Sequence, residues 1–173
     1  RFKQFSAVNF HISDNLRFIA FRGTDKFIVG WKEDLCLALA DPVESQKSSV
    51  RYLTRCASGF DGEIITGGHS KGGNLAVYAS AFCDPAVREK ILAVYSNDGP
   101  GFKQKMTDSE EYMQLLPKIV SIIPDTSIIG LLLSSKSAHH VVKSSANGIL
   151  QHDGLTWQVQ RNRFIEAPLS PTA

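Results

Sequence analysis

The sequence lacks the features that mark nucleic-acid-binding, membrane-spanning and repetitive proteins. Its net charge is only +2 over 173 residues and its basic residues are scattered, which argues against a nucleic-acid partner. The longest apolar run, residues 128–133, is far too short for a transmembrane segment. No repeat or low-complexity segment is present. Hydrophobic residues at 43% and charged residues at 21% are typical of a soluble globular protein, and we expect a single domain over residues 1–173.

Cysteine is also scarce, which excludes a disulfide-rich scaffold. Cys36, Cys56 and Cys83 are odd in number, and their spacing fits no metal site. We expect reduced, mostly buried thiols in a cytoplasmic protein, with no metal and no cofactor. The sequence opens on Arg1 with strand-like residues, so we also expect a signal peptide or another N-terminal segment to have preceded it. Composition does not determine the oligomeric state.

Hydrophobic patterning predicts that strands and helices alternate through the middle of the chain. The strands there are apolar on both faces, which indicates a parallel sheet covered by helices. We therefore predict an α/β-hydrolase-like fold, with a mostly parallel sheet, helices on both faces and an antiparallel N-terminal hairpin. The expected strands are 5–12, 16–21, 63–66, 91–95, 118–123, 141–143 and 155–159, and the expected helices are 45–58, 74–82, a short one from 85, and 108–117.

The segment Gly68-His69-Ser70-Lys71-Gly72 matches the pattern G-x-S-x-G between an expected strand and an expected helix. In that context the pattern predicts a nucleophile elbow, a tight turn that exposes a serine hydroxyl above the sheet. Glycine is needed on either side because a Cβ would collide with the neighbouring strand and helix. A glycine-rich loop that merely contains a serine is the alternative. The flanking elements favour the elbow, so Ser70 is the candidate nucleophile.

A serine nucleophile needs a carboxylate that orients its general base, and on this type of fold the carboxylate precedes the histidine in the chain. Asp125 directly follows an apolar strand, at the sheet edge where catalytic groups collect. Asp98 also follows a strand, but Asn97-Asp98-Gly99-Pro100-Gly101 is what any sharp turn would contain. We favour Asp125 as the acid and keep Asp98 as the alternative.

Three histidines follow Ser70 and could serve as its base. His152 lies in a loop before the last expected strand and follows Asp125 in the required order. His139 and His140 lie among small polar residues and could simply be solvated. We favour His152 as the base.

Stabilising an oxyanion requires two N–H donors. The backbone of Lys71, the residue after the serine, is expected to supply one of them. Thr24 follows the early turn at Gly23, which allows close backbone approach, and is expected to supply the other.

Several motifs resemble those of known lipases. Phe21-Arg22-Gly23-Thr24, Gly30-Trp31 with Asp34-Leu35, and the elbow are similar to the class 3 lipase pattern. The motifs at 97–102, 123–130, 142–145 and 151–157 resemble the bacterial Mbeg1-like family of lipase-like proteins more closely. The resemblance covers nearly the whole chain. It implies an α/β-hydrolase fold, with Ser70 as nucleophile, Asp125 as acid, His152 as base and Thr24 as oxyanion donor.

The sequence therefore predicts a serine hydrolase acting on a small-molecule ester or a lipid-like substrate. Transacylation would share the same acyl-enzyme step, and sequence does not separate it from hydrolysis. The alternative is a catalytically weak member of the fold that binds an acylated ligand or a protein partner, because a fold does not guarantee an activity.

Overall fold

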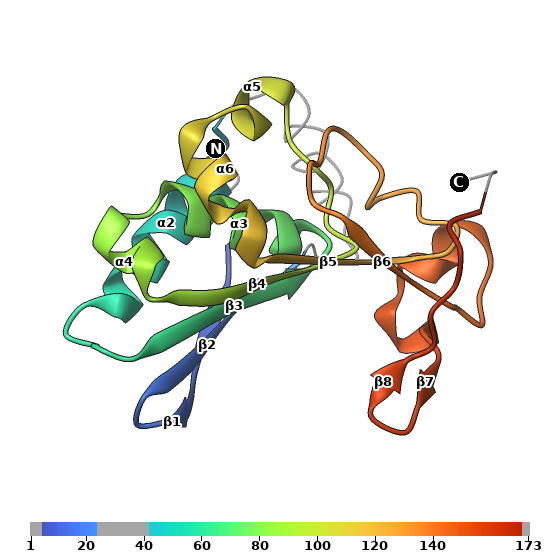
Figure 1. The fold of residues 1–173 in the computed structure, drawn as a ribbon, viewed down its shortest axis with the longest axis horizontal. Helices are drawn as coiled ribbons and strands as arrows, with labels where there is room; N and C mark the ends of the chain where they lie inside the picture. The colour runs from blue at the N-terminus through green and yellow to red at the C-terminus, as the bar shows by residue number, and fades with distance from the viewer. Residues whose placement is uncertain (1–4, 24–41, 171–173) are drawn as a thin grey trace.

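A six-stranded sheet forms the centre of the protein in the computed structural model, which describes residues 5–23 and 42–170. The strands lie side by side in their order along the chain, from β1 at one edge to β6 at the other (Figure 1). The first pair is antiparallel and every later pair is parallel, which confirms the mostly parallel sheet with an N-terminal hairpin. The strands are β1 (Ala7–Ser13), β2 (Leu16–Phe21), β3 (Glu63–His69), β4 (Ile91–Asn97), β5 (Ile119–Pro124) and β6 (His139–Val142).

The described α-helices all lie on one face of this sheet (Figure 1). Each parallel strand pairs with its predecessor, and right-handed connections between strands in this order return over one face, where the described helices lie. The expected helical cover on both faces is therefore not found in the described part of the chain. The helices are α2 (Glu44–Ala57), α3 (Lys71–Phe82), α4 (Pro85–Glu89), α5 (Gln104–Thr107) and α6 (Glu110–Leu115), which the 3₁₀ turn η1 (Leu116–Lys118) follows.

The hydrophobic core lies between the sheet and helices α2 and α3. Ile19, Ile64 and Val94 point toward these helices and are fully buried, as is Leu75 of α3. Successive side chains of a strand point to opposite faces, so the neighbours of these residues line the other face, where Ile65 is only half-buried. Burial on the helical face thus fixes the strand register that leads into the elbow.

After β6 the chain leaves the parallel sheet and forms a small C-terminal unit. It contains the 3₁₀ turns η2 (Gly148–His152) and η3 (Gly154–Thr156) and a hairpin of β7 (Val159–Gln160) and β8 (Arg163–Phe164). The strand expected over 155–159 is therefore not continuous, because its first two residues belong to η3 and only its last, Val159, belongs to β7. Isolated bridges join Val142 to Glu166 and Ser144 to Trp157, so this unit is tied to the edge of the sheet.

The two cysteines within the described residues are free thiols. Cys83 is buried, and burial raises the pKa of its thiol to about 11, so it stays protonated at neutral pH. Cys56 is half-buried, and Cys36 lies outside the described residues. None of the helices in the described ranges is long and apolar enough to cross a membrane.

Candidate active site

Ser70 occupies the turn between β3 and α3 in a strained backbone conformation. Its φ of 58° and ψ of −130° lie in a region that residues with a side chain rarely adopt. The turn is held by a hydrogen bond from the Ser70 N–H to the Asn97 carbonyl at 2.9 Å. The Gly73 N–H donates to the Ser70 carbonyl, also at 2.9 Å. This is the geometry expected of a nucleophile elbow.

Two glycines make the elbow sterically possible. A Cβ on Gly68 would lie 2.4 Å from the Gly72 carbonyl carbon and 2.5 Å from the Phe21 carbonyl oxygen. A Cβ on Gly72 would lie only 2.1 Å from the same Phe21 oxygen. Since these obstacles are backbone atoms, no side chain can rotate to relieve the contact. Strand β2, the elbow and α3 therefore meet at a point where only glycine fits.

His152 forms a hydrogen-bonded pair with Asp98. The Nδ1 atom of His152 lies 2.7 Å from Oδ2 of Asp98, whose side chain is 1% exposed. The other carboxylate oxygen, Oδ1, accepts hydrogen bonds from Ser127 Oγ at 2.5 Å and from the Gly130 N–H at 3.0 Å. Three donors thus fix the orientation of a buried carboxylate, and the carboxylate in turn fixes the imidazole.

Asp125, the favoured acid, does not contact His152. Its N–H donates to the Val142 carbonyl at 3.0 Å and its carbonyl accepts from the Ser170 N–H at 2.8 Å. Its carboxylate oxygen Oδ1 is buried and has no hydrogen-bond partner among the described residues. The expected contact between Asp125 and His152 is therefore wrong, and the alternative acid, Asp98, takes that position.

Strand register explains why Asp98 is the closer carboxylate. Strands β3 and β4 are neighbours, and His69 of β3 pairs with Asn97 of β4. Ser70 and Asp98 each follow one residue later, so they leave adjacent strands at the same level of the carboxyl edge. Asp125 follows β5, one strand further from the elbow.

Of the two residues expected to bind an oxyanion, the structure describes Lys71 but not Thr24. Lys71 is the first residue of α3, and its side chain is 1% exposed. Thr24 lies outside the described residues. The preceding residue, Gly23, lies against the elbow, because a Cβ on it would be 2.7 Å from the His69 carbonyl oxygen and 3.5 Å from Ser70 Cβ.

The alternative histidines do not join the pair formed by Asp98 and His152. The Nδ1 atom of His139 lies 2.9 Å from Ser121 Oγ, and burial lowers the pKa of the imidazole although the charge of Asp98 opposes this. His140 is exposed. His152 is therefore the histidine that the structure brings to an acid beside the elbow.

His69 is a residue of the site that sequence reasoning missed. Its Nε2 lies 2.6 Å from the His152 carbonyl oxygen, and the two imidazole rings are 4.5 Å apart. Burial lowers the pKa of His69, and the neighbouring charge of protonated His152 lowers it further. Its position in the sequence could have indicated this, because His69 is the residue directly before the serine in the G-x-S-x-G motif.

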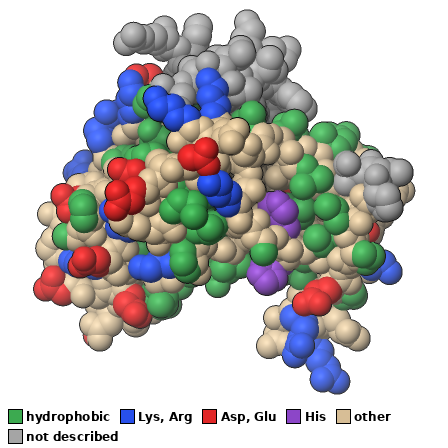
Figure 2. Space-filling view, turned by 45° about the horizontal axis from the view of Figure 1, so that its top comes forward, with side chains coloured by type: hydrophobic (Ala, Val, Ile, Leu, Met, Phe, Trp, Pro, Cys, Tyr) green, Lys and Arg blue, Asp and Glu red, His purple; other side chains and the backbone are tan. Residues whose placement is uncertain are grey.

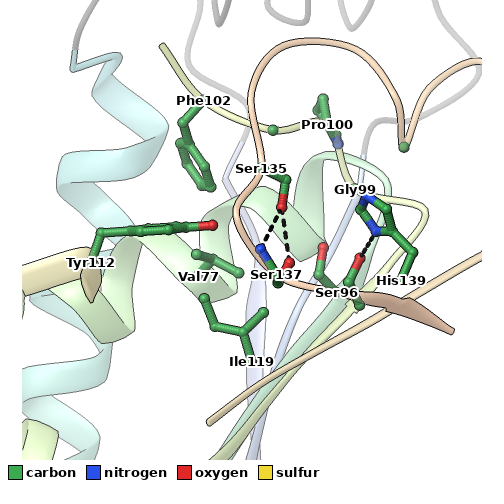
Figure 3. A pocket seen from close by; sticks show the side chains of 13 residues that line it. Val77, Ser96, Gly99, Pro100, Phe102, Tyr112, Ile119, Ser135, Ser137 and His139 are labelled. Atoms are coloured by element: carbon green, nitrogen blue, oxygen red, sulfur yellow. Dashed lines mark hydrogen bonds between the residues drawn. The ribbon is translucent and has the colours of Figure 1, made fainter. Parts of the chain in front are cut away.

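A small pocket lies beside Gly99 and Pro100, the two residues that follow Asp98 (Figure 3). Gly99 and Gly130 line it, together with hydroxyl and imidazole groups of Ser96, Tyr112 and His139. Neither Ser70 nor His152 contributes to its lining. The pocket is thus separate from Ser70 and His152, although two of its lining residues, Gly99 and Gly130, lie next to Asp98 in the chain or in space.

The two half-buried histidines, His69 and His139, predict that acid destabilises the protein. Because His69 and His139 have lowered pKa values in the fold, the unfolded chain binds more protons once the pH falls below about 6.5. Stability should therefore decline as the pH falls through that value. The melting temperature measured between about pH 7.5 and pH 5 tests this. A double variant, His69→Gln with His139→Gln, should show a weaker pH dependence than the exposed control His140→Gln, and equal slopes would contradict the prediction.

The fold and the elbow define the class of the protein. A mostly parallel sheet with a strained serine turn at its carboxyl edge is a lipase-like α/β-hydrolase fold. A deletion mutant of the Rhizomucor miehei lipase in complex with its propeptide shares this fold, and superimposes with a TM-score of 0.55 at 14% identity. A fungal lipase–inhibitor complex gives 0.49 at 16% identity. The matches cover 80% and 83% of this chain but only 52% and 63% of those lipases.

The family follows from the sequence itself. A model of the Mbeg1-like family matches residues 1–171, so the chain belongs to the Mbeg1-like family. No curated protein matches the sequence.

Proposed function

We propose that the protein is a serine hydrolase that cleaves a carboxylic ester through Ser70, His152 and Asp98. The observation that carries the proposal is the hydrogen bond between His152 and the buried carboxylate of Asp98, beside an elbow that holds Ser70 in a strained turn. Backbone strain at a serine, together with a histidine whose second nitrogen is held by a carboxylate, is the arrangement that activates a hydroxyl nucleophile.

The proposed reaction proceeds in two steps. Ser70 Oγ attacks the ester carbonyl carbon while Nε2 of His152 takes its proton, and Asp98 stabilises the imidazolium through Nδ1–H. The Lys71 N–H and a donor from Thr24 bind the negative oxygen. His152 then returns the proton to the departing alcohol, which leaves an acyl group on Ser70. In the second step a water molecule, deprotonated by His152, attacks the acyl group and releases the carboxylic acid.

The surface around the site favours an ester with an apolar group. Hydrophobic side chains border histidine side chains at the surface of the molecule (Figure 2). Leu150 on η2 and Leu155 on η3 flank His152 in the chain and are 69% and 95% exposed. Leu132, in the loop after Gly130, is 48% exposed. We therefore propose a small-molecule ester or lipid-like substrate with an apolar acyl or alcohol group.

A fluorophosphonate probe tests the proposal. Phosphorus is attacked by an activated serine with loss of fluoride, so intact mass should show one adduct on the wild-type protein and none on Ser70→Ala. The exposed serine variant Ser135→Ala is the matched control and should be labelled like the wild type. Labelled protein should also lose turnover of short p-nitrophenyl esters. A wild-type protein that is folded but carries no adduct on Ser70 would remove Ser70 from the mechanism.

One observation favours the second candidate function, a binding protein of the same fold. No hydrogen bond joins the Ser70 hydroxyl to the His152 ring, both of which are described. Catalytic hydrogen bonds often form only when substrate is present. The missing bond between the Ser70 hydroxyl and the His152 ring is therefore compatible with an enzyme. Saturable binding of a non-hydrolysable ester analogue without any adduct or turnover would identify the binding protein instead.

A further inference from the structure

We infer that His69 is a positioning residue that clamps the turn carrying His152 to the nucleophile elbow. The inference rests on the proposed function, since it assigns a role within the same site. His69 is the last residue of β3 and is covalently joined to Ser70. It therefore connects the nucleophile and the base by one short path, a peptide bond on one side and a hydrogen bond on the other.

The contact itself defines which atoms act. Nε2 of His69 lies 2.6 Å from the carbonyl oxygen of His152. A carbonyl oxygen only accepts, so Nε2 must carry the hydrogen and donate it. The two rings also lie in tilted contact, at a centroid distance of 4.5 Å with an interplanar angle of 39°. His69 thus holds both the backbone and the ring face of His152.

Trp157 binds the carbonyl of Gln151, the residue before His152 in the same turn. Its Nε1–H donates to the Gln151 carbonyl at 2.8 Å, and its ring packs edge-on against His69 at 6.3 Å. The Gln151 side chain is fixed as well, since its Oε1 accepts from the Thr126 N–H at 3.0 Å. Consecutive carbonyls of η2 are therefore each held by a side-chain donor, and the two donors pack against each other.

The origin of His152 explains why such a clamp is needed. His152 comes from the C-terminal unit, on a 3₁₀ turn of five residues rather than on a strand or α-helix of the sheet. Asp98 holds only the imidazole nitrogen Nδ1. Without His69 the backbone of His152 could shift relative to Ser70, and displacements of about 1 Å at a reacting group can cost 10²-fold in rate.

The charge state of His69 suits this role. Burial is the main reason that its pKa is lowered, followed by the charge on His152, while the hydrogen bond to the His152 backbone and the charges of Asp98 and Asp153 oppose the shift. His69 is therefore neutral at neutral pH and donates from Nε2. A neutral neighbour does not repel the imidazolium that forms on His152 during the reaction.

Two substitutions at His69 separate the clamp from simple packing. His69→Phe keeps an aromatic ring against His152 but removes the donor, and His69→Gln keeps a donor but removes the ring. We expect His69→Phe to lower kcat by about 10-fold to 100-fold with little change in KM. His69→Gln should recover most of that loss. His11→Phe, which replaces an exposed histidine on β1, is the matched control and should retain wild-type kcat.

A spectroscopic measurement tests the clamp apart from turnover. The Nδ1 proton shared by His152 and Asp98 should give a downfield proton resonance in wild type and His69→Gln, and a resonance broadened by exchange in His69→Phe. Wild-type kcat together with an unchanged resonance in His69→Phe would overturn the inference. A fall in kcat that His69→Gln fails to recover would also overturn it. If wild type neither turns over esters nor reacts with fluorophosphonate, the proposed function fails, and the resonance alone decides the clamp.

Discussion

Asp98→Asn should lower kcat/KM for a p-nitrophenyl ester by about 10⁴-fold, the cost of replacing a triad acid by its amide. The new amide would present an NH₂ donor where the carboxylate of Asp98 now accepts from Nδ1 of His152. The imidazole would then adopt the tautomer that carries its hydrogen on Nε2, the atom that must take the proton from Ser70. The loss should appear mainly in kcat, with KM little changed.

The backbone at Asp98 makes this substitution a clean test. Its φ of 48° lies in the left-handed region, which asparagine tolerates better than most residues, so the turn should persist. Asp125→Asn is the matched control, because it makes the same chemical change at the end of the next strand. It should cost less than about 10-fold, since Asp125 does not contact the base. Circular dichroism would verify folding, and an inactive Asp125→Asn beside an active Asp98→Asn would contradict the assignment.

The sequence was sufficient to predict the elbow because every determinant of it is local. Strand, glycine, serine, glycine and helix follow one another within about twenty residues, and each has a steric reason to be there. The motif predicts that Gly68 and Gly72 are needed. It does not say that the atoms a side chain would meet belong to the backbone of Phe21. The choice of His152 as base likewise needed only chain order.

The carboxylate that contacts His152 could not be predicted, because the contact depends on strand register, which is not local. Chain order favoured Asp125, and the turn sequence around Asp98 offered a sufficient structural reason for that residue. In the structure Asp98 both forms the turn and contacts His152. Its left-handed backbone directs the carboxylate toward Ser127, Gly130 and His152. A residue that the turn requires can therefore also be the one that contacts His152.

The described helices all lie on one face of the sheet, and the sequence could not predict which face each helix covers. Alternating strands and helices predict a parallel sheet, but they do not give the order of its strands. Only a reversal of that order would send right-handed crossovers to the second face, and here the order is monotonic. Residues such as Ile65 and Tyr95 are apolar yet only half-buried for this reason.

Gly72→Val is expected to have the largest effect on folding, because Gly72 lies at the tightest contact of the elbow. The first side-chain atom would lie 2.1 Å from the Phe21 carbonyl oxygen, and two further backbone carbons lie within 3.1 Å. Overpacking of this kind costs about 3 kcal/mol or more, since rigid backbone cannot move aside. For a chain of this size that corresponds to a fall in melting temperature of roughly 6–12 °C.

The matched control for that substitution is Gly154→Val, which adds the same side chain where no atom lies within 4 Å. Calorimetry of both variants should show a large loss of stability for Gly72→Val and almost none for Gly154→Val. Any folded fraction of Gly72→Val should also fail to react with fluorophosphonate, because relief of the clash must move either β2 or α3 away from Ser70. Equal melting temperatures for the two variants would mean that the segment around Ser70 is an open loop, in which case the strain at Ser70 could not be maintained by the fold.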